Sequence, residues 1–151
     1  MGVQDSTDVA YASGYFDGEG TITTCGAMLR IQVLSADYWC IKVFSDLFGG
    51  NLAEIKPRPS IYAPGLRVFR WIKTGQSVVE VLRAMRPYLR CKGAEADIVL
   101  NSGIAFGTPG ARVSEEQRNI RKAVRLQLKA LKGVGRQVNY PAAVRVEGER
   151  A

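Results

Sequence analysis

Near the N-terminus, apolar and polar residues alternate over residues 29–34. The apolar positions are Leu29, Ile31 and Val33, and the polar ones between them are Arg30 and Gln32. Because successive side chains of a strand point to opposite faces of a sheet, this pattern predicts a half-buried strand with a polar outer face. The strand-prone residues 21–25 precede it, and a turn at Gly26 is expected to join the two segments into a hairpin.

Helical spacing of apolar residues predicts helices on either side of this hairpin. The first is expected to be capped by Ser6 or Thr7 and to end near Asp17. The second is expected over about residues 36–48, where a Gly-Gly pair follows. Its buried side is expected to comprise Trp39, Val43, Phe44 and Leu47.

Further along the chain, the pattern predicts a second pair of strands and three more helices. Strands are expected over residues 51–56 and 66–73, on either side of a loop marked by Pro57, Pro59 and Pro64. Helices are expected over residues 75–88 with Thr74 as the cap, over 92–106, and over 114–132 with a capping box that begins at Ser114. The direction of Arg70 in its strand is open, and Trp71 is expected in the core unless that strand faces a groove.

The order α-β-β-α-β-β-α, followed by two helices, predicts an α+β fold. Two hairpins separated by a helix suggest one four-stranded antiparallel sheet with helices packed on one face. The other face would then be open and polar. We expect a single domain over residues 1–136 and an irregular tail over residues 137–151.

The charge of the chain makes nucleic acid a candidate partner for the open face. Lys and Arg number 21 against 14 Asp and Glu, which gives a net charge of +7, and such an excess attracts polyanions. Eight of these basic residues lie between Arg112 and Arg136. A solvated helix face explains this run slightly better than direct contact with DNA.

Other residue types exclude several classes of protein. The chain has no histidine and three widely spaced cysteines, which argues against a zinc finger, a disulfide scaffold, and Ser-His or Cys-His catalysis. No apolar run approaches the length of a membrane span, and the N-terminus does not resemble a signal peptide. We therefore expect a soluble intracellular protein.

Residues 10–20 contain the most informative segment. Ala10, Gly14 and Gly18 recur every four residues, and small residues at that spacing let two helices approach closely. Asp17 and Glu19 follow at the expected helix end, where carboxylates and backbone carbonyls could hold a divalent cation. By residue types alone, a turn that leads into a strand explains the acidic and glycine residues better than a metal site does.

The full segment Ala12–Gly20, however, resembles the nine-residue motif of the LAGLIDADG homing endonuclease family. Gly14, Asp17 and Gly20 match the motif, and Glu19 replaces its second aspartate with the same charge. A second segment, Pro87-Tyr88-Leu89 followed by Lys92, resembles the family's lysine-bearing segment after its fourth strand. The resemblance covers about residues 7–106 and agrees with the predicted order of elements.

The resemblance implies a homodimer, because only one motif is present. Ala10, Gly14 and Gly18 would pack against the second subunit. Glu19 and the Gly18 carbonyl would bind Mg²⁺ or Mn²⁺, and Glu19 and Lys92 would be the catalytic residues. Asp17 would fix the backbone at the helix end, and Ser35 replaces a glutamine that organises water in some relatives.

The implied function is site-specific hydrolysis of a long pseudo-palindromic double-stranded DNA target. Residues expected to bind DNA are Thr21, Thr23, Arg30, Gln32, Asn51, Lys56, Arg58, Arg67 and Lys73. The alternative within the same family is a nonenzymatic intron maturase or DNA-binding regulator. An unrelated basic RNA-binding protein remains a third possibility if the motif arose by chance.

Overall fold

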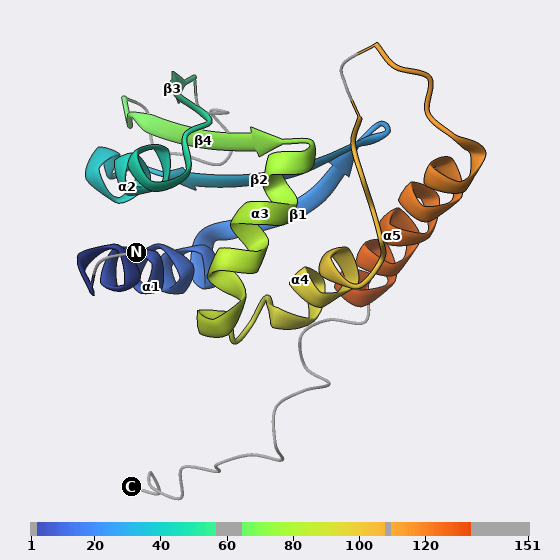
Figure 1. Cartoon of the computed structure of the whole chain (residues 1–151). Coiled ribbons are helices and arrows are strands. Elements are labelled where there is room, and N and C mark those ends of the chain that lie inside the picture. Colours follow the sequence, from blue (N-terminus) through green and yellow to red (C-terminus); the bar gives the residue numbers. More distant parts are fainter. Residues whose placement is uncertain (1–2, 57–64, 108–109, 134–151) are drawn as a thin grey trace, which may run out of the picture.

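The computed structural model describes residues 3–56, 65–107 and 110–133, and side chains from Ser6 onward (Figure 1). The predicted loop at residues 57–64, Arg58 within it, and the tail over residues 137–151 lie outside the described residues. The elements are α1 (Val3–Glu19), β1 (Gly20–Cys25), β2 (Met28–Ser35), α2 (Tyr38–Phe48), β3 (Asn51–Ile55), β4 (Val68–Thr74), α3 (Gln76–Met85), the 3-10 turn η1 (Arg86–Tyr88), α4 (Gly93–Leu100) and α5 (Glu115–Gly133).

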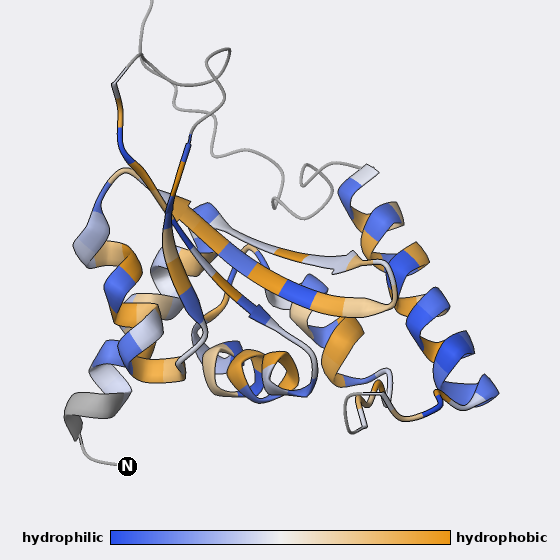
Figure 2. Ribbon diagram, turned by 90° about the horizontal axis from the view of Figure 1, so that it is seen from above, coloured by the Kyte–Doolittle hydropathy of each residue, from blue (hydrophilic) through white to orange (hydrophobic). Residues whose placement is uncertain are grey.

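The four strands form one antiparallel sheet in the order β1-β2-β4-β3. Helices α1, α3 and α4 lie below the sheet in Figure 1. Figure 2 looks down from above, with the strands in front of those helices. The predicted α+β fold, with one helix-covered and one open sheet face, is confirmed.

The register assigns each side chain of the strands to one of these faces. Ile22 pairs with Ile31, and Val33 pairs with Trp71. All four are fully buried on the helix-covered face, as the alternation predicted for β2. The Trp71 indole N–H also donates to the Gly49 carbonyl at 2.7 Å, so the core position expected for Trp71 is confirmed.

The boundaries of the first helix differ from the prediction. It begins at Val3 and continues to Glu19, so Ser6 and Thr7 lie inside it and do not cap it. Hydroxyl side chains can hydrogen-bond to the backbone within a helix as well as at its start, so their presence does not fix the helix boundary. The motif helix consequently carries Glu19 as its last residue, next to the first residue of β1.

Two predicted helix starts and one predicted buried position are wrong. Helix α2 begins at Tyr38, and the Asp37 carboxylate caps it by accepting from the Trp39 N–H at 2.9 Å. Trp39 is 72% exposed because it lies two and five residues from the buried Ile41 and Phe44, on the opposite side of a helix with 3.6 residues per turn. Thr74 belongs to β4, and Gly75 is the N-cap of α3 with φ 76°, a conformation that favours glycine.

The two C-terminal helices were predicted in part. Helix α4 ends at Leu100, well before the predicted end near residue 106. Half of the capping box expected for α5 is formed: the Ser114 hydroxyl accepts from the Gln117 N–H at 3.2 Å. The Gln117 side chain bonds instead to the backbone of Ala105 and Gly103. Val124 and Leu128 bury its apolar stripe.

Helix α5 lies beside β1, the edge strand of the sheet. Lys132 near its C-terminus donates to the Ile22 carbonyl at 2.5 Å, which satisfies a backbone group on the open strand edge. No helix among residues 3–133, where the structure describes them, is both long and apolar enough to cross a membrane.

Candidate functional site

Asp17 joins the end of α1 to the segment that precedes α4. Its carboxylate accepts three backbone N–H bonds, from Arg90 at 2.6 Å, Cys91 at 2.9 Å and Lys92 at 2.8 Å. The side chain is only 9% exposed. Asp17 therefore fixes the backbone, as the resemblance implied, and its oxygens are occupied by these donors.

The electrostatics of Asp17 favour its charged form. Burial alone would raise the pKa of this carboxyl. The backbone N–H bonds from Lys92, Cys91 and Arg90, together with the charge of Lys92, outweigh burial and hold the pKa below its usual value of 3.8. The carboxylate is therefore charged at neutral pH.

Lys92 is a buried cation at the same junction. It is 1% exposed, and its ammonium group donates to the Asp17 carbonyl at 2.7 Å. A carbonyl in the last turn of a helix lacks a partner within the helix and lies at the negative end of the helix dipole. The two sequence segments of the resemblance are thus in direct contact, although about 75 positions separate them.

Glu19 and Gly18 lie at the other side of this helix end and are exposed. Glu19 presents a carboxylate, and Gly18 presents a backbone carbonyl. Within the described part of the chain, no group of three or more Asp, Glu, Cys or His residues could hold a metal ion.

Most of the polar residues predicted to bind DNA share the open face. Thr21 pairs with Gln32, and Thr23 pairs with Arg30. Both pairs alternate with the buried Ile22 and Ile31, so they point away from the helices. Asn51 pairs with Ile72, which in turn pairs with Gln32, and so it lies in the same row.

Two of the residues predicted to bind DNA, Arg67 and Lys73, do not share the open face. Lys73 pairs with the buried Ile31, and its ammonium group donates to the Phe48 carbonyl at the end of α2. Arg67 forms two bonds to Glu54, at 3.0 and 2.8 Å, and Glu54 has the register of the helix-covered face. Lys73 alternates in β4 with the buried Trp71 on this same face.

The register of β4 adds Arg70, whose direction the sequence left open, to the open face. It pairs with Leu34 on one side and Ala53 on the other, so it occupies the middle of the sheet. The buried neighbours Phe69 and Trp71 could have indicated this direction, because two large aromatic residues on one face leave Arg70 on the other. Lys56 is exposed just after β3, and the strand register assigns it no face.

Ser35 has local hydrogen-bonding partners. Its hydroxyl accepts from the Tyr15 hydroxyl at 2.7 Å and from the Asp37 N–H at 2.9 Å. It stands at the end of β2, opposite Phe69 on the helix-covered face. These contacts connect α1, β2 and the start of α2.

The glycine stripe on α1 is uncovered. Gly14 and Gly18 are exposed, and a Cβ atom added at either would meet no atom within 4 Å. Ala10 is half-buried, and Tyr11 beside the stripe is 50% exposed. The Tyr11 hydroxyl donates to the Cys40 sulfur at 3.4 Å, a contact that contributes most to raising the pKa of Tyr11 to about 12.

The four-stranded antiparallel sheet, backed by a helix that ends in the acidic motif, is the fold of the LAGLIDADG homing endonucleases. Among solved structures, the chain is similar to two crystal structures of the homing endonuclease I-CvuI. One is in complex with its target (Sro1.3) in the presence of 2 mM Ca, with a TM-score of 0.52 and 17% identity. The other is in complex with the I-CreI target (C1221) in the presence of 2 mM Mg, with DNA not cleaved, a TM-score of 0.54 and 16% identity.

Each match covers 85% of this chain and 98% of the other. No family model matches the chain, and no curated protein matches it. At this level of identity, the likeness shows the fold.

Proposed function

We propose that this chain is one subunit of a homodimeric, metal-dependent homing endonuclease that hydrolyses phosphodiester bonds of a long pseudo-palindromic DNA duplex. The observation that carries the proposal is the contact of Asp17 and Lys92, which fixes the helix end so that Glu19 is exposed beside the first strand of an open, polar sheet. The Glu19 carboxylate stands at the negative end of the helix dipole, where an anion is disfavoured and a bound cation would be favoured.

The residues at the helix end fit a divalent cation with a preference for oxygen ligands. The Glu19 carboxylate and the Gly18 carbonyl are the exposed oxygen donors, and Mg²⁺ takes such ligands together with phosphate oxygens and water. Asp17 is not part of this set because backbone N–H groups occupy it. When bound, the metal would supply water activation and stabilisation of the leaving oxygen.

The protein's own residues have separate roles in this proposal. Glu19 attracts the cation and fixes its place relative to the sheet. Lys92 holds the carbonyl end of α1 and adds positive charge where the phosphate gains negative charge. Arg30, Gln32 and Arg70 lie on the open sheet face, which would lie against a groove of the duplex. Arg and Gln side chains can pair there with base edges or phosphates.

A second copy of the chain would complete the site. The stripe of Ala10, Gly14 and Gly18 leaves room for close packing against its symmetry mate, and a twofold axis between the two α1 helices would bring two Glu19 side chains near each other. Two sheets related by this axis would read a target with twofold symmetry. This is the reason for expecting a pseudo-palindrome.

The test is selection of cleaved sites from a random duplex library with Mg²⁺. We expect enrichment of one pseudo-palindromic sequence, cut on both strands near its centre. Recovery of a specific binding site without any cleavage would contradict the nuclease and favour the maturase or regulator. Absence of binding to every duplex would contradict both.

A further inference from the structure

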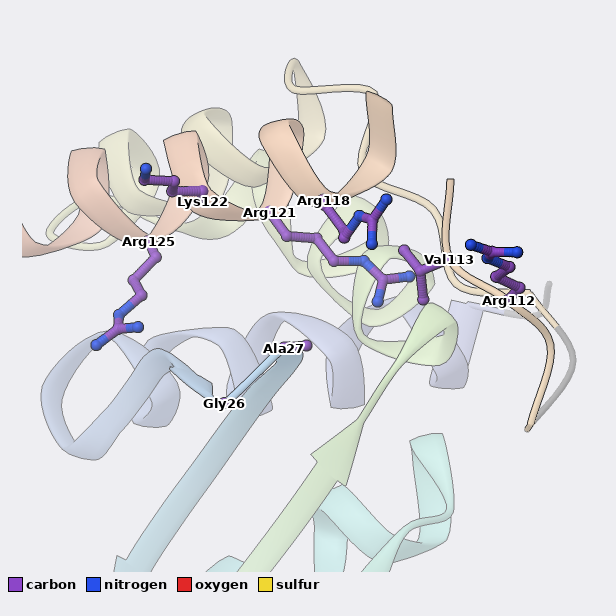
Figure 3. A pocket seen from close by; sticks show the side chains of 8 residues that line it. All are labelled: Gly26, Ala27, Arg112, Val113, Arg118, Arg121, Lys122 and Arg125. Carbon is purple, nitrogen blue, oxygen red and sulfur yellow. The ribbon is translucent and has the colours of Figure 1, made fainter. Parts of the chain in front are cut away.

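A basic pocket of about 460 Å³ lies between the turn of the β1–β2 hairpin and the first half of α5 (Figure 3). The turn contributes Gly26 and Ala27. Five cationic side chains also line the pocket: Arg112, Arg118, Arg121, Lys122 and Arg125. Arg121 and Arg125 extend from α5 toward the side on which the turn lies. We call this feature the α5 pocket.

The positive charge of the α5 pocket is not neutralised by the described part of the protein. None of the described residues that line it is acidic. Arg118, Lys122 and Arg125 make no ion pair or side-chain hydrogen bond with any described residue. Other cations of the protein, Lys42, Arg67 and Arg86, do pair with carboxylates. Like charges gathered at one point repel each other, and an anion in the pocket would relieve that repulsion.

The side chain of Arg121 is held in place at the pocket wall by contacts with other residues. It donates to the Ala105 carbonyl at 2.8 Å, and its guanidinium lies 4.3 Å from the centre of the Phe106 ring. Its Nε is buried without a hydrogen-bond partner among the described residues. A guanidinium held in place in this way is suited to bind an oxyanion.

The position of the pocket fits the path of a bound duplex. Strand β1 runs from Gly20, next to Glu19, to Cys25 beside the turn. Its six residues span about 20 Å, the length of about six base pairs. Arg30 lies between these ends on the open face, and its Nε is likewise buried without a partner in the described part of the chain.

We infer that the α5 pocket binds backbone phosphates of the DNA duplex, at the flank of the segment that lies on the sheet. This inference rests on the proposed function and extends its contact surface beyond the hairpin turn. Arginine guanidinium groups match phosphate oxygens in pairs, so Arg118 and Arg125 would add affinity without reading sequence. The basic run of α5 is thereby assigned a partner, where its sequence slightly favoured a solvated face.

The test compares two double variants that remove the same charge. Arg118→Gln with Arg125→Gln alters the pocket, and Arg83→Gln with Lys129→Gln alters exposed cations that do not line it. All four side chains are exposed, so thermal unfolding should be nearly unchanged in both variants. The probe is a DNA duplex of arbitrary sequence with about four helical turns, roughly 40 base pairs, titrated over a range of salt concentrations.

The pocket variant should reduce the slope of log affinity against log salt by about 0.9 for each phosphate that it no longer neutralises. The control variant should leave the slope close to that of the wild type. If the wild type binds DNA and the two variants give equal slopes, the inferred phosphate binding is overturned and the proposed function stays intact. Weaker binding of the pocket variant to an RNA duplex, but not to the DNA duplex, would also overturn the inference. Failure of the wild type to bind DNA would instead refute the proposed function.

Discussion

Asp17 and Glu19 are two acidic residues of one motif, and the structure gives them different environments. Asp17 is buried and bonded to three backbone N–H groups, while Glu19 is exposed. The difference follows from their positions at the helix end, because Asp17 faces the segment before α4 and Glu19 begins the passage into β1. A carboxylate with three donors stabilises the fold, and a carboxylate without them is available to a cation.

Asp17→Asn should destabilise the protein in a pH-dependent manner. The variant keeps one acceptor oxygen but loses the charge, and charge-assisted bonds of this kind contribute about 1.5–3 kcal/mol each. Because the folded pKa of Asp17 is lowered, its contribution is fully present above the unfolded value of about 3.8 and is lost as the pH falls through the folded pKa. The difference in free energy of unfolding should therefore be constant near neutral pH and shrink below about pH 4.

Denaturant unfolding of both proteins over a range of about pH 3–7 would measure this difference. Asp8→Asn on the same helix is the matched control, since its side chain has no such set of backbone donors among the described residues. A difference between wild type and Asp17→Asn that stays constant down to the lowest pH would contradict the assignment of a charged Asp17.

At the scale of elements, the sheet shows which parts of a pattern can be read from sequence. The alternation in β2 predicted its faces because Leu29, Ile31 and Val33 are uniformly apolar. In β4 both faces carry apolar residues, so hydrophobicity alone did not set the phase and left the direction of Arg70 open. The burial of Phe69 and Trp71 determines which side chains of β4 face the helices. This burial depends on packing against α2.

Contacts between distant segments could not be predicted from local sequence patterns. The bonds from Arg90, Cys91 and Lys92 to Asp17 join positions more than 70 residues apart. Only the resemblance to a family placed these segments together. The α5 pocket has the same origin, since it needs the hairpin turn and the helix side by side.

The corrected face assignment predicts different effects for two basic residues of the sheet. Arg30→Ala, on the open face, should weaken discrimination between target and random duplex. Lys73→Ala should leave that discrimination unchanged, because Lys73 donates to the Phe48 carbonyl on the other face. Affinity ratios for the selected and random duplexes would measure this, and equal effects in the two variants would contradict the face assignment.

The α1 stripe allows a test of assembly that leaves the subunit fold intact. Gly14→Leu should abolish dimers, because a large side chain on the stripe would prevent close helix packing. The subunit itself should stay folded, since a Cβ at Gly14 meets nothing within 4 Å. Sedimentation of the variant and the wild type would measure this, and a wild type that remains monomeric on DNA would refute the expected dimer.

Gly20→Ala is the contrasting variant within the same motif. A Cβ there would lie 2.3 Å from the Phe16 ring, which is fully buried in the core. Overpacking of this kind costs about 1–3 kcal/mol, so this variant should lower the free energy of unfolding. Comparing the two glycine variants separates loss of assembly from loss of folding.

At the scale of the whole molecule, the features that we propose to contact DNA lie one after another along the first hairpin. The net charge of +7 accompanies an open sheet face, an acidic helix end beside its first strand, and the α5 pocket beyond its first hairpin. Under the proposed function, these three features follow a duplex outward from the point of cleavage. Glu19 is then an acidic group at a surface otherwise suited to phosphate.

This arrangement makes Glu19→Gln the most direct test of the central claim. The variant keeps the size of the side chain and removes the charge that attracts the cation. The measurement is cutting of the selected duplex with Mg²⁺, beside a binding titration with Ca²⁺. Glu80→Gln, which changes an exposed glutamate on α3, is the matched control.

The account predicts that Glu19→Gln cuts at least about a hundredfold more slowly than the wild type, a reduction typical of removing one group that stabilises the transition state. Its affinity for DNA should be equal or higher, because a negative charge near the phosphates is removed. The control should cut at the wild-type rate. Cutting by Glu19→Gln at the wild-type rate would contradict the assignment of this helix end as the active site.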